Sequence, residues 1–565
     1  MTRRSWLLLA ILLLLEGVLV AGVFLPSPHS GGDNAGYVAL AQALAGGEGY
    51  TEVWDPARPP HTKYPPVFPL LLAFALAAGA AGWASLKAVP VVAALAAVAG
   101  VFLWARRRLG EGAGFAVALL TGLSPSLLYH AHWLLSDVPF LAFTALALWQ
   151  LEAFTREADE RDAPGGRPGR AALALSVVLV ALAAFTRTAG LPLAVAAVGA
   201  CAWRRRRWRE AAALGVGVGV PALLWALRGR VAGPGEGRYG SEFFLRDPYQ
   251  PDLGAAGVAD FAVRVGENLT GYGLRFLPET LLGSASPALV GLLLAVLALA
   301  LAGWVRALRR SPGAAELFVP LYAGLIVLWP AVWSGDRFAL PLVPLLLVYG
   351  AEAAHALLER RRVGAGPRRA LLAGAALLVA LPALGDWVRA RDGAARCRGA
   401  LAVAGPWACG GLALVDFAAA ARWAGEHLPP GSAALVRKPR IWYAESGVPA
   451  RTYPFSEASG ALVAEARRAG AEYVVLDYLG GQGARFVGAA LAEAPEAFCE
   501  VARFGGAGDV PATRILRLLP PGETSASRRT AEGIVLAECA GGPSVRIRDT
   551  TATGPDGWRI PILGH

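Results

Sequence analysis

Long apolar runs separated by short arginine clusters form the dominant pattern along this chain. A helix needs about 20 mostly apolar residues to cross a bilayer, and segments of that length or slightly less recur up to residue 387. They lie at 6–25, 67–83, 86–104, 112–130, 138–155, 171–186, 189–203, 211–228, 281–304, 314–333, 338–358 and 370–387. The pattern predicts a polytopic α-helical membrane protein with about eleven to thirteen transmembrane or membrane-dipping helices.

The arginine clusters indicate which loops face the cytoplasm, because cytoplasmic loops are enriched in basic residues. The clusters lie at 2–4, 105–110, 155–170, 204–209, 306–310 and 359–369. All of them fall on the cytoplasmic side only if segment 67–83 enters the membrane without crossing it. That segment follows YPPVFP and contains Gly79 and Gly82, which suit an irregular helix. We therefore expect about eleven crossings plus one non-spanning segment, with the N-terminus in the cytoplasm.

This topology brings several polar stretches to the outer face. The first loop (26–66), the loop 229–280 and everything after about residue 388 are expected outside. Three shorter stretches share that side: LLSDVPF at 134–140, FTRTAG at 185–190 and WSGDRFALP at 333–341.

The chain changes character after residue 388. Two amphipathic helix patterns alternate with strand patterns, and the second strand is the apolar run EYVVLD. Such alternation predicts a small α/β domain over roughly 415–520. We accordingly divide the chain into three parts: a membrane domain (1–390), an extracytoplasmic α/β domain (391–520), and a polar tail (521–565) with the pattern of a strand pair at its end.

Composition supports a membrane protein, and the excess of basic residues does not indicate a nucleic-acid partner. Of 565 residues, 55% are hydrophobic and only 17% are charged, which is too few charges to cover a soluble protein of this length. Basic cytoplasmic loops account for the formal net charge of +11, so this charge does not indicate nucleic-acid binding. The N-terminal apolar run has no clear cleavage site, and we expect it to remain as the first transmembrane helix.

Four of the five cysteines lie in the part expected outside, where disulfides persist. An even number permits two bridges, and Cys397 with Cys409 is the easiest local pairing, which would leave Cys499 and Cys539. No spacing is typical of a metal site.

Two residues of the first outer loop could carry chemistry. Asp33 in GGDNAGYVALAQAL is either the cap of the helix that follows or a reacting carboxylate. Lys63 in HTKYPPVFP is either an interfacial lysine that snorkels toward head groups or a point charge for a phosphate.

Three more candidates lie at the outer ends of apolar segments. Asp137 in SDVPF is either a helix-start acid or a functional acid at the membrane surface. Arg187 and Arg337 are expected on the outer side, although basic residues are enriched on the cytoplasmic side. Their position therefore favours binding of an anionic ligand. The alternative is an ion pair with a neighbouring acid such as Asp336.

Taken together, these stretches resemble the GT-C superfamily of membrane glycosyltransferases. Within it they are most similar to glycosyltransferase family 39 and its bacterial relatives, which include the lipid A aminoarabinose transferase and the protein O-mannosyltransferases. The resemblance covers most of residues 1–520. Its motifs are GGDNAGYVALAQAL, KYPPVFPLLLA, SDVPF, FTRTAG, DRFALPLVPLLL and, in the outer domain, YVVLD.

The resemblance implies a hexosyl- or pentosyltransferase that takes its sugar from a polyprenyl-phosphate donor. It would act on the outer face of the bacterial cytoplasmic membrane, in cell-envelope glycan or lipopolysaccharide modification. By their place in the motifs, Asp33 matches the first-loop catalytic aspartate, Asp137 a second acid, and Lys63 the basic residue near the donor phosphate. Arg187 and Arg337 lie where relatives often carry basic residues. The acceptor, whether lipid, glycan or protein, is left open.

One departure from the resemblance concerns metal ions. Many relatives carry two consecutive acids in the first loop, whereas Asn34 follows Asp33 here. We therefore expect no essential metal and no cofactor, the lipid-linked sugar being a substrate.

The expected chemistry suits these groups. An alcohol is a poor nucleophile at neutral pH, so a carboxylate beside it takes its proton during an inverting displacement, while cations stabilise the departing phosphate. Two other functions stay open: a flippase for lipid-linked glycans, for which internal repeats and broken helices are typical, and a non-catalytic membrane scaffold.

Overall fold

The computed structural model describes residues 1–160, 169–205, 207–232, 239–310, 312–506, 510–530, 533–539 and 545–547. Its contacts divide the chain into two compact units. The helical unit comprises Met1–Phe24, Thr62–Phe68 and Lys87–Ala394, and the sheet unit comprises Leu25–His61, Pro69–Leu86 and Ala395–His565. Half of the arginine cluster at 155–170, residues 161–168, lies outside the described residues. The predicted domain boundary at residue 390 stays a prediction.

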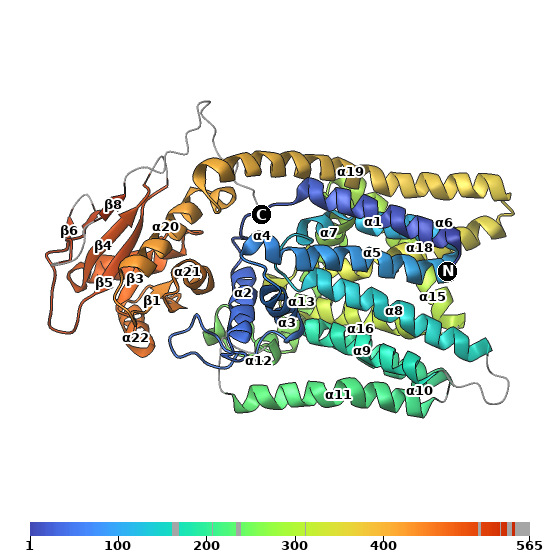
Figure 1. The fold of residues 1–565 in the computed structure, drawn as a ribbon, viewed down its shortest axis with the longest axis horizontal. Helices are drawn as coiled ribbons and strands as arrows, with labels where there is room; N and C mark the ends of the chain where they lie inside the picture. The colour runs from blue at the N-terminus through green and yellow to red at the C-terminus, as the bar shows by residue number, and fades with distance from the viewer. Residues whose placement is uncertain are drawn as a thin grey trace. The chain divides into compact units, whose positions relative to one another are not determined.

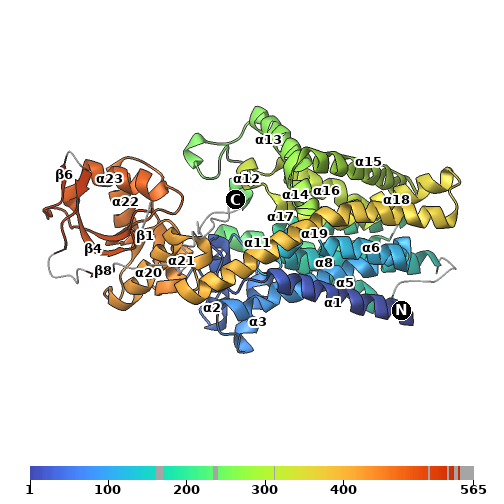
Figure 2. The ribbon, with the colours of Figure 1, turned by 90° about the horizontal axis from the view of Figure 1, so that it is seen from above.

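The helical unit is a bundle of long apolar helices. Neighbours along the bundle are α1 and α5, α5 and α8, and α8 and α9 (Figure 1), while α15 lies against both α16 and α18 (Figure 2). Its helices are α1 (Arg3–Val23), α5 (Ala88–Leu109), α6 (Glu111–Gly122), α7 (Pro125–His130), α8 (Asp137–Glu160), α9 (Arg170–Thr186), α10 (Leu191–Arg205), α11 (Trp208–Val231), α12 (Tyr239–Phe243), α13 (Val258–Gly271), α14 (Leu277–Leu282), α15 (Pro287–Arg310), α16 (Ala314–Leu328), α17 (Asp336–Ala339) and α18 (Val343–Arg360).

The apolar segments predicted from the sequence are helical. Among the described residues, six helices are long and apolar enough to cross a membrane, and the exact number of crossings stays a prediction. Segment 112–130 is two helices, because Ser124 caps α7 and Pro125 starts it. Segment 370–387 is part of a much longer helix, α19 (Ala365–Ala404).

Segment 67–83 contains a helix too short to cross a bilayer alone. Its helix α3 (Val67–Ala77) has 11 residues, or about 16 Å at 1.5 Å per residue, against a hydrocarbon core of about 30 Å. Gly79 and Gly82 follow it with φ of +97° and +112°, and a single turn, α4 (Trp83–Leu86), ends the segment. This geometry agrees with the expected non-spanning segment.

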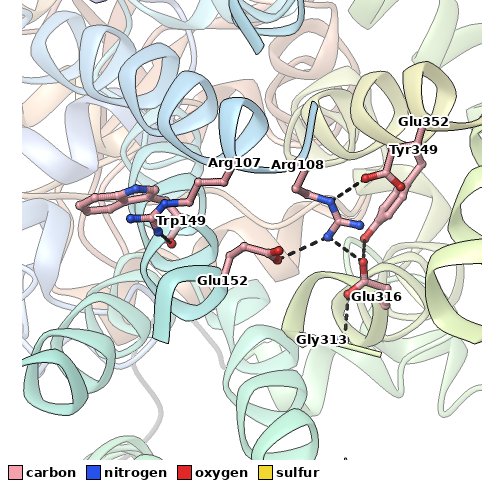
Figure 3. A network of polar contacts seen from close by, with 8 residues as sticks. All are labelled: Arg107, Arg108, Trp149, Glu152, Gly313, Glu316, Tyr349 and Glu352. Carbon is pink, nitrogen blue, oxygen red and sulfur yellow. Dashed lines mark hydrogen bonds and ion pairs between the residues drawn. The ribbon is translucent and has the colours of Figure 1, made fainter. Parts of the chain in front are cut away.

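A buried ionic cluster joins four helices of the bundle (Figure 3). Arg108 on α5 donates to Glu352 of α18 at 2.8 Å and contacts Glu316 of α16 at 2.8 Å and Glu152 of α8 at 3.4 Å. Tyr349 of α18 donates to Glu316 at 2.9 Å. Because buried charges are stable only when paired, this cluster fixes these helices relative to one another.

The sheet unit contains an α/β domain, as predicted. Its sheet has the order β2-β1-β3-β5-β4-β8, with β1 parallel to β2 and β3, and β5 antiparallel to β3 and β4. The strands are β1 (Ala434–Val436), β2 (Ala450–Thr452), β3 (Tyr473–Leu476), β4 (Phe498–Phe504), β5 (Thr513–Leu518) and β8 (Val545–Ile547). In the tail, β6 (Arg528–Thr530) and β7 (Gly533–Val535) form a strand pair near its start, whereas the end of the tail, where the sequence predicts a strand pair, lies outside the described residues.

Alternating side chains of the sheet build a core on each face. Ala434 and Val436 pack with α20 (Leu412–His427) and α21 (Pro439–Ser446), whereas Leu435 packs with α22 (Ser459–Ala469) and α23 (Gly488–Glu493). Helix α2 (Gly32–Ala45), from the first loop, packs against α21 in the same unit. The bridges Cys397–Cys409 and Cys499–Cys539 are both formed.

Candidate active site

Asp33 lies in the first turn of α2 in the sheet unit. The cap residue of this helix is Gly31, so the alternative that Asp33 is the helix cap is wrong. Its carboxylate lies at the N-terminal end of the helix, where the helix dipole is positive. The side chain is 43% exposed, so an incoming group can reach it.

A residue of the C-terminal domain holds the Asp33 side chain. Nη1 of Arg440 donates to Oδ1 of Asp33 at 3.1 Å. Gly36, one turn further along α2, makes room for this contact, because a Cβ there would lie 2.8 Å from Cδ of Arg440. The guanidinium also lies 5.2 Å from the centroid of the Trp54 ring. These contacts fix Arg440, and through it the orientation of the carboxylate.

The rest of the first loop is attached to the same domain. Arg451 donates to both carboxylate oxygens of Asp55, at 2.7 and 2.9 Å. The N–H of Ala450 donates to the carbonyl of Trp54 at 2.7 Å. The predicted catalytic loop and the α/β domain therefore form one compact unit.

Charged residues gather where the neighbouring strands β1 and β3 end. Arg437 and Lys438 follow β1, and Asp477 follows β3 and accepts from the N–H of Leu479 at 3.0 Å. Burial raises the pKa of Asp477 to about 6, against the charges of Arg437 and Lys438. Burial also lowers the pKa of Lys438, against the charges of Asp33 and Asp477. Asp33 is thus within electrostatic reach of this end of the sheet.

Lys63 lies in the helical unit and contacts two residues of the short helix α12. Its Nζ donates to Oε1 of Glu242 at 2.8 Å. It also lies 5.4 Å from the centroid of the Tyr239 ring and 5.1 Å from that of Trp333. The ammonium is therefore held by one carboxylate and two aromatic faces rather than extended toward head groups.

The structure pairs Asp137 with Arg187 and places Arg187 and Arg337 against the same aromatic ring. Asp137, the first residue of α8, accepts a short hydrogen bond from Arg187, which follows α9. The guanidinium carbons of Arg187 and Arg337 lie 4.9 and 5.2 Å from the centroid of the same ring, Phe338. Both guanidinium groups therefore lie next to the same ring, and Asp137 is bonded to Arg187.

Sequence reasoning missed the partners of Asp336. Its carboxylate accepts from the hydroxyl of Ser126 at 2.8 Å and lies 3.4 Å from Nε2 of His130. Both partners are polar residues in the second half of the apolar segment 112–130, and their polarity is the signal that the sequence offers. Within the described ranges, no three His, Cys, Asp or Glu side chains gather as a metal site would require. A metal-independent site stays a prediction.

Comparison with known proteins identifies the fold. No protein-family model and no curated protein matches this sequence. Archaeal oligosaccharyltransferase AglB from Archaeoglobus fulgidus, in complex with an inhibitory peptide and a dolichol-phosphate, gives a TM-score of 0.53 at 15% identity, over 84% of this chain and 70% of its own.

Two further solved structures cover nearly all of this chain. ArnT from Cupriavidus metallidurans bound to undecaprenyl phosphate gives a TM-score of 0.53 at 14% identity, over 91% of this chain and 98% of its own. Arabinofuranosyltransferase AftD from Mycobacteria gives a TM-score of 0.50 at 18% identity. The match covers 93% of this chain and 40% of the AftD chain. The chain therefore has the GT-C fold that its motifs predict.

Proposed function

We propose that this chain is a membrane glycosyltransferase of the bacterial cytoplasmic membrane. It transfers a sugar from a polyprenyl-phosphate donor to an acceptor hydroxyl on the outer face. The fold supports a transferase, and two similar structures contain an isoprenoid phosphate, undecaprenyl phosphate in one and dolichol-phosphate in the other. The observation that carries the proposal is the exposed carboxylate of Asp33, oriented by Arg440.

Asp33 is the general base in this proposal. The acceptor oxygen attacks the anomeric carbon and its proton passes to the Asp33 carboxylate. The bond from that carbon to the phosphate oxygen breaks, and the phosphate leaves with the electron pair. Displacement from the opposite side inverts the anomeric carbon. A carboxylate that is exposed and held in one orientation suits this step, because a base must lie within hydrogen-bond reach of the proton.

Lys63, Arg187 and Arg337 bind the donor phosphate in the same proposal. A lipid phosphate is a good leaving group that needs positive charge more than a proton, and cations act strongly where water is excluded. Asp137 acts through Arg187, which it orients. The second acid is therefore a positioning residue.

Separating cleavage from transport tests this function. The purified chain in nanodiscs is incubated with radiolabelled polyprenyl-phosphate sugars, hexosyl and pentosyl, and an envelope extract that supplies acceptors. We expect label to leave the lipid-linked donor, with one polyprenyl phosphate released per sugar transferred. In proteoliposomes, movement of intact donor across the bilayer without cleavage would indicate a flippase. If the donor is neither cleaved nor moved, the chain is a scaffold.

A further inference from the structure

The ammonium of Lys63 is already bound to an anion of its own chain. Glu242 lies on the short helix α12 and accepts from Lys63 at 2.8 Å. The two side chains are 16% and 13% exposed. Tyr239, on the same helix, and Trp333 add their ring faces to the ammonium. Lys63 is therefore enclosed on the side of the loop 229–280.

The backbone around Glu242 is held in place. Arg264, buried on α13, donates to the carbonyls of Phe243 and Leu245 at 2.8 and 2.7 Å. The ring of Phe243 lies 6.0 Å from that of Trp329, centroid to centroid. Because the residues next to Glu242 are fixed by buried hydrogen bonds and aromatic packing, its contact with Lys63 is a built feature and not a surface ion pair.

The Glu242 carboxylate is only half satisfied. Oε1 accepts from Lys63, while Oε2 is buried and has no hydrogen-bond partner among the described residues. A buried acceptor without a partner costs free energy. The Glu242 carboxylate is thus held against the Lys63 ammonium, although only one of its two oxygens accepts a hydrogen bond there.

We propose that Glu242 is a specificity residue that competes with the donor phosphate for Lys63. The inference rests on the proposed function, in which Lys63 binds that phosphate. A carboxylate and a phosphate oxygen make the same kind of charge-assisted bond to an ammonium, and one ammonium does not neutralise two adjacent anions. The phosphate therefore binds only by displacing Glu242.

This competition lowers the affinity of Lys63 for every anion by the same factor, so only an anion with a further source of binding free energy stays bound at low concentration. Any anion that takes Lys63 loses part of its binding free energy to the opening of the Lys63–Glu242 pair. A polyprenyl phosphate offsets that cost by burying its chain, because each methylene removed from water adds to binding. Inorganic phosphate has no such contribution, so the intact pair excludes it.

Replacing Glu242 with Gln tests the inference. In nanodiscs, we expect the E242Q variant to bind undecaprenyl phosphate about tenfold more tightly than wild type, since the competing charge is gone. We also expect millimolar inorganic phosphate to inhibit donor binding by this variant and not by wild type. Should E242Q fold poorly, Glu242→Ala gives the same direction. Glu267→Gln, which changes an exposed acid of α13, is the matched control and should leave both measurements unchanged.

Lys63→Met separates this inference from the proposed function. If donor binding by Lys63→Met equals that of wild type, Lys63 does not bind the phosphate, and both the donor site and the competition are wrong. If Lys63→Met and E242Q both weaken binding, Glu242 holds the lysine in place and the competition alone is wrong. A fall in kcat for E242Q at unchanged donor affinity would also overturn it, because Glu242 would then act in the chemical step.

Discussion

The two predicted acids are held in different ways. Asp137 is 2% exposed and hydrogen-bonded to Arg187 at the start of a bundle helix. Asp33 is 43% exposed, and Arg440 contacts one of its oxygens. A carboxylate that takes a proton from an incoming alcohol must be reachable, whereas a buried carboxylate bonded to a guanidinium fixes that guanidinium. In the proposed mechanism, this difference favours Asp33 for proton transfer and Asp137 for positioning.

The largest expected effect comes from breaking the buried pair. Asp137→Asn removes the buried carboxylate that Arg187 binds, which should cost about 3–5 kcal/mol of stability. The double variant with Arg187→Gln should recover most of that loss but not transfer activity. Thermal and denaturant unfolding in detergent measure the stability of the single variant and of the double variant. Glu279→Gln, in an exposed pair with Arg275, is the control and should change stability by no more than about 1 kcal/mol. A single variant as stable as wild type would contradict the positioning role.

Asp477 offers the opposite case, a buried acid whose removal should stabilise the protein. Burial raises its pKa to about 6, above its value near 4 in an unfolded chain. The folded protein thus holds the proton more tightly, and its stability falls as pH rises through the folded pKa. Asp477→Asn should therefore stabilise the protein by about 3 kcal/mol at about pH 7.5 and not at all at about pH 4. Unfolding at both pH values, with the exposed Glu472→Gln as control, measures this; equal gains at both would refute it.

The smallest effect on stability, but a clear one on rate, is expected at Arg440. Arg440→Gln breaks a partly exposed pair, so stability should change by no more than about 1 kcal/mol. Single-turnover transfer should fall about tenfold, because the base loses its orientation, while donor affinity stays unchanged. Arg422→Gln, in a pair with Glu445 of the same domain, is the control. Loss of donor affinity with an unchanged rate would place Arg440 in the donor site instead.

The sequence predicts the apolar helices, the α/β domain and its buried strand well, because each follows from a local pattern. It does not predict which groups meet. The partner of Asp33 is 407 residues away in the chain, and that of Lys63 is 179 residues away. Helix α21, which carries Arg440, has eight residues and no clear apolar period. Arg440 reaches Asp33 on α2 only once the α/β domain has folded.

The central claim is that Asp33, and not Asp137, takes the acceptor proton. The most direct test is the single-turnover rate of folded, donor-bound Asp33→Asn protein. We predict that this rate falls roughly 10²–10⁴-fold, the usual contribution of a general base, while affinity for the polyprenyl-phosphate sugar stays within about twofold. Transfer at the wild-type rate by this variant would contradict the account.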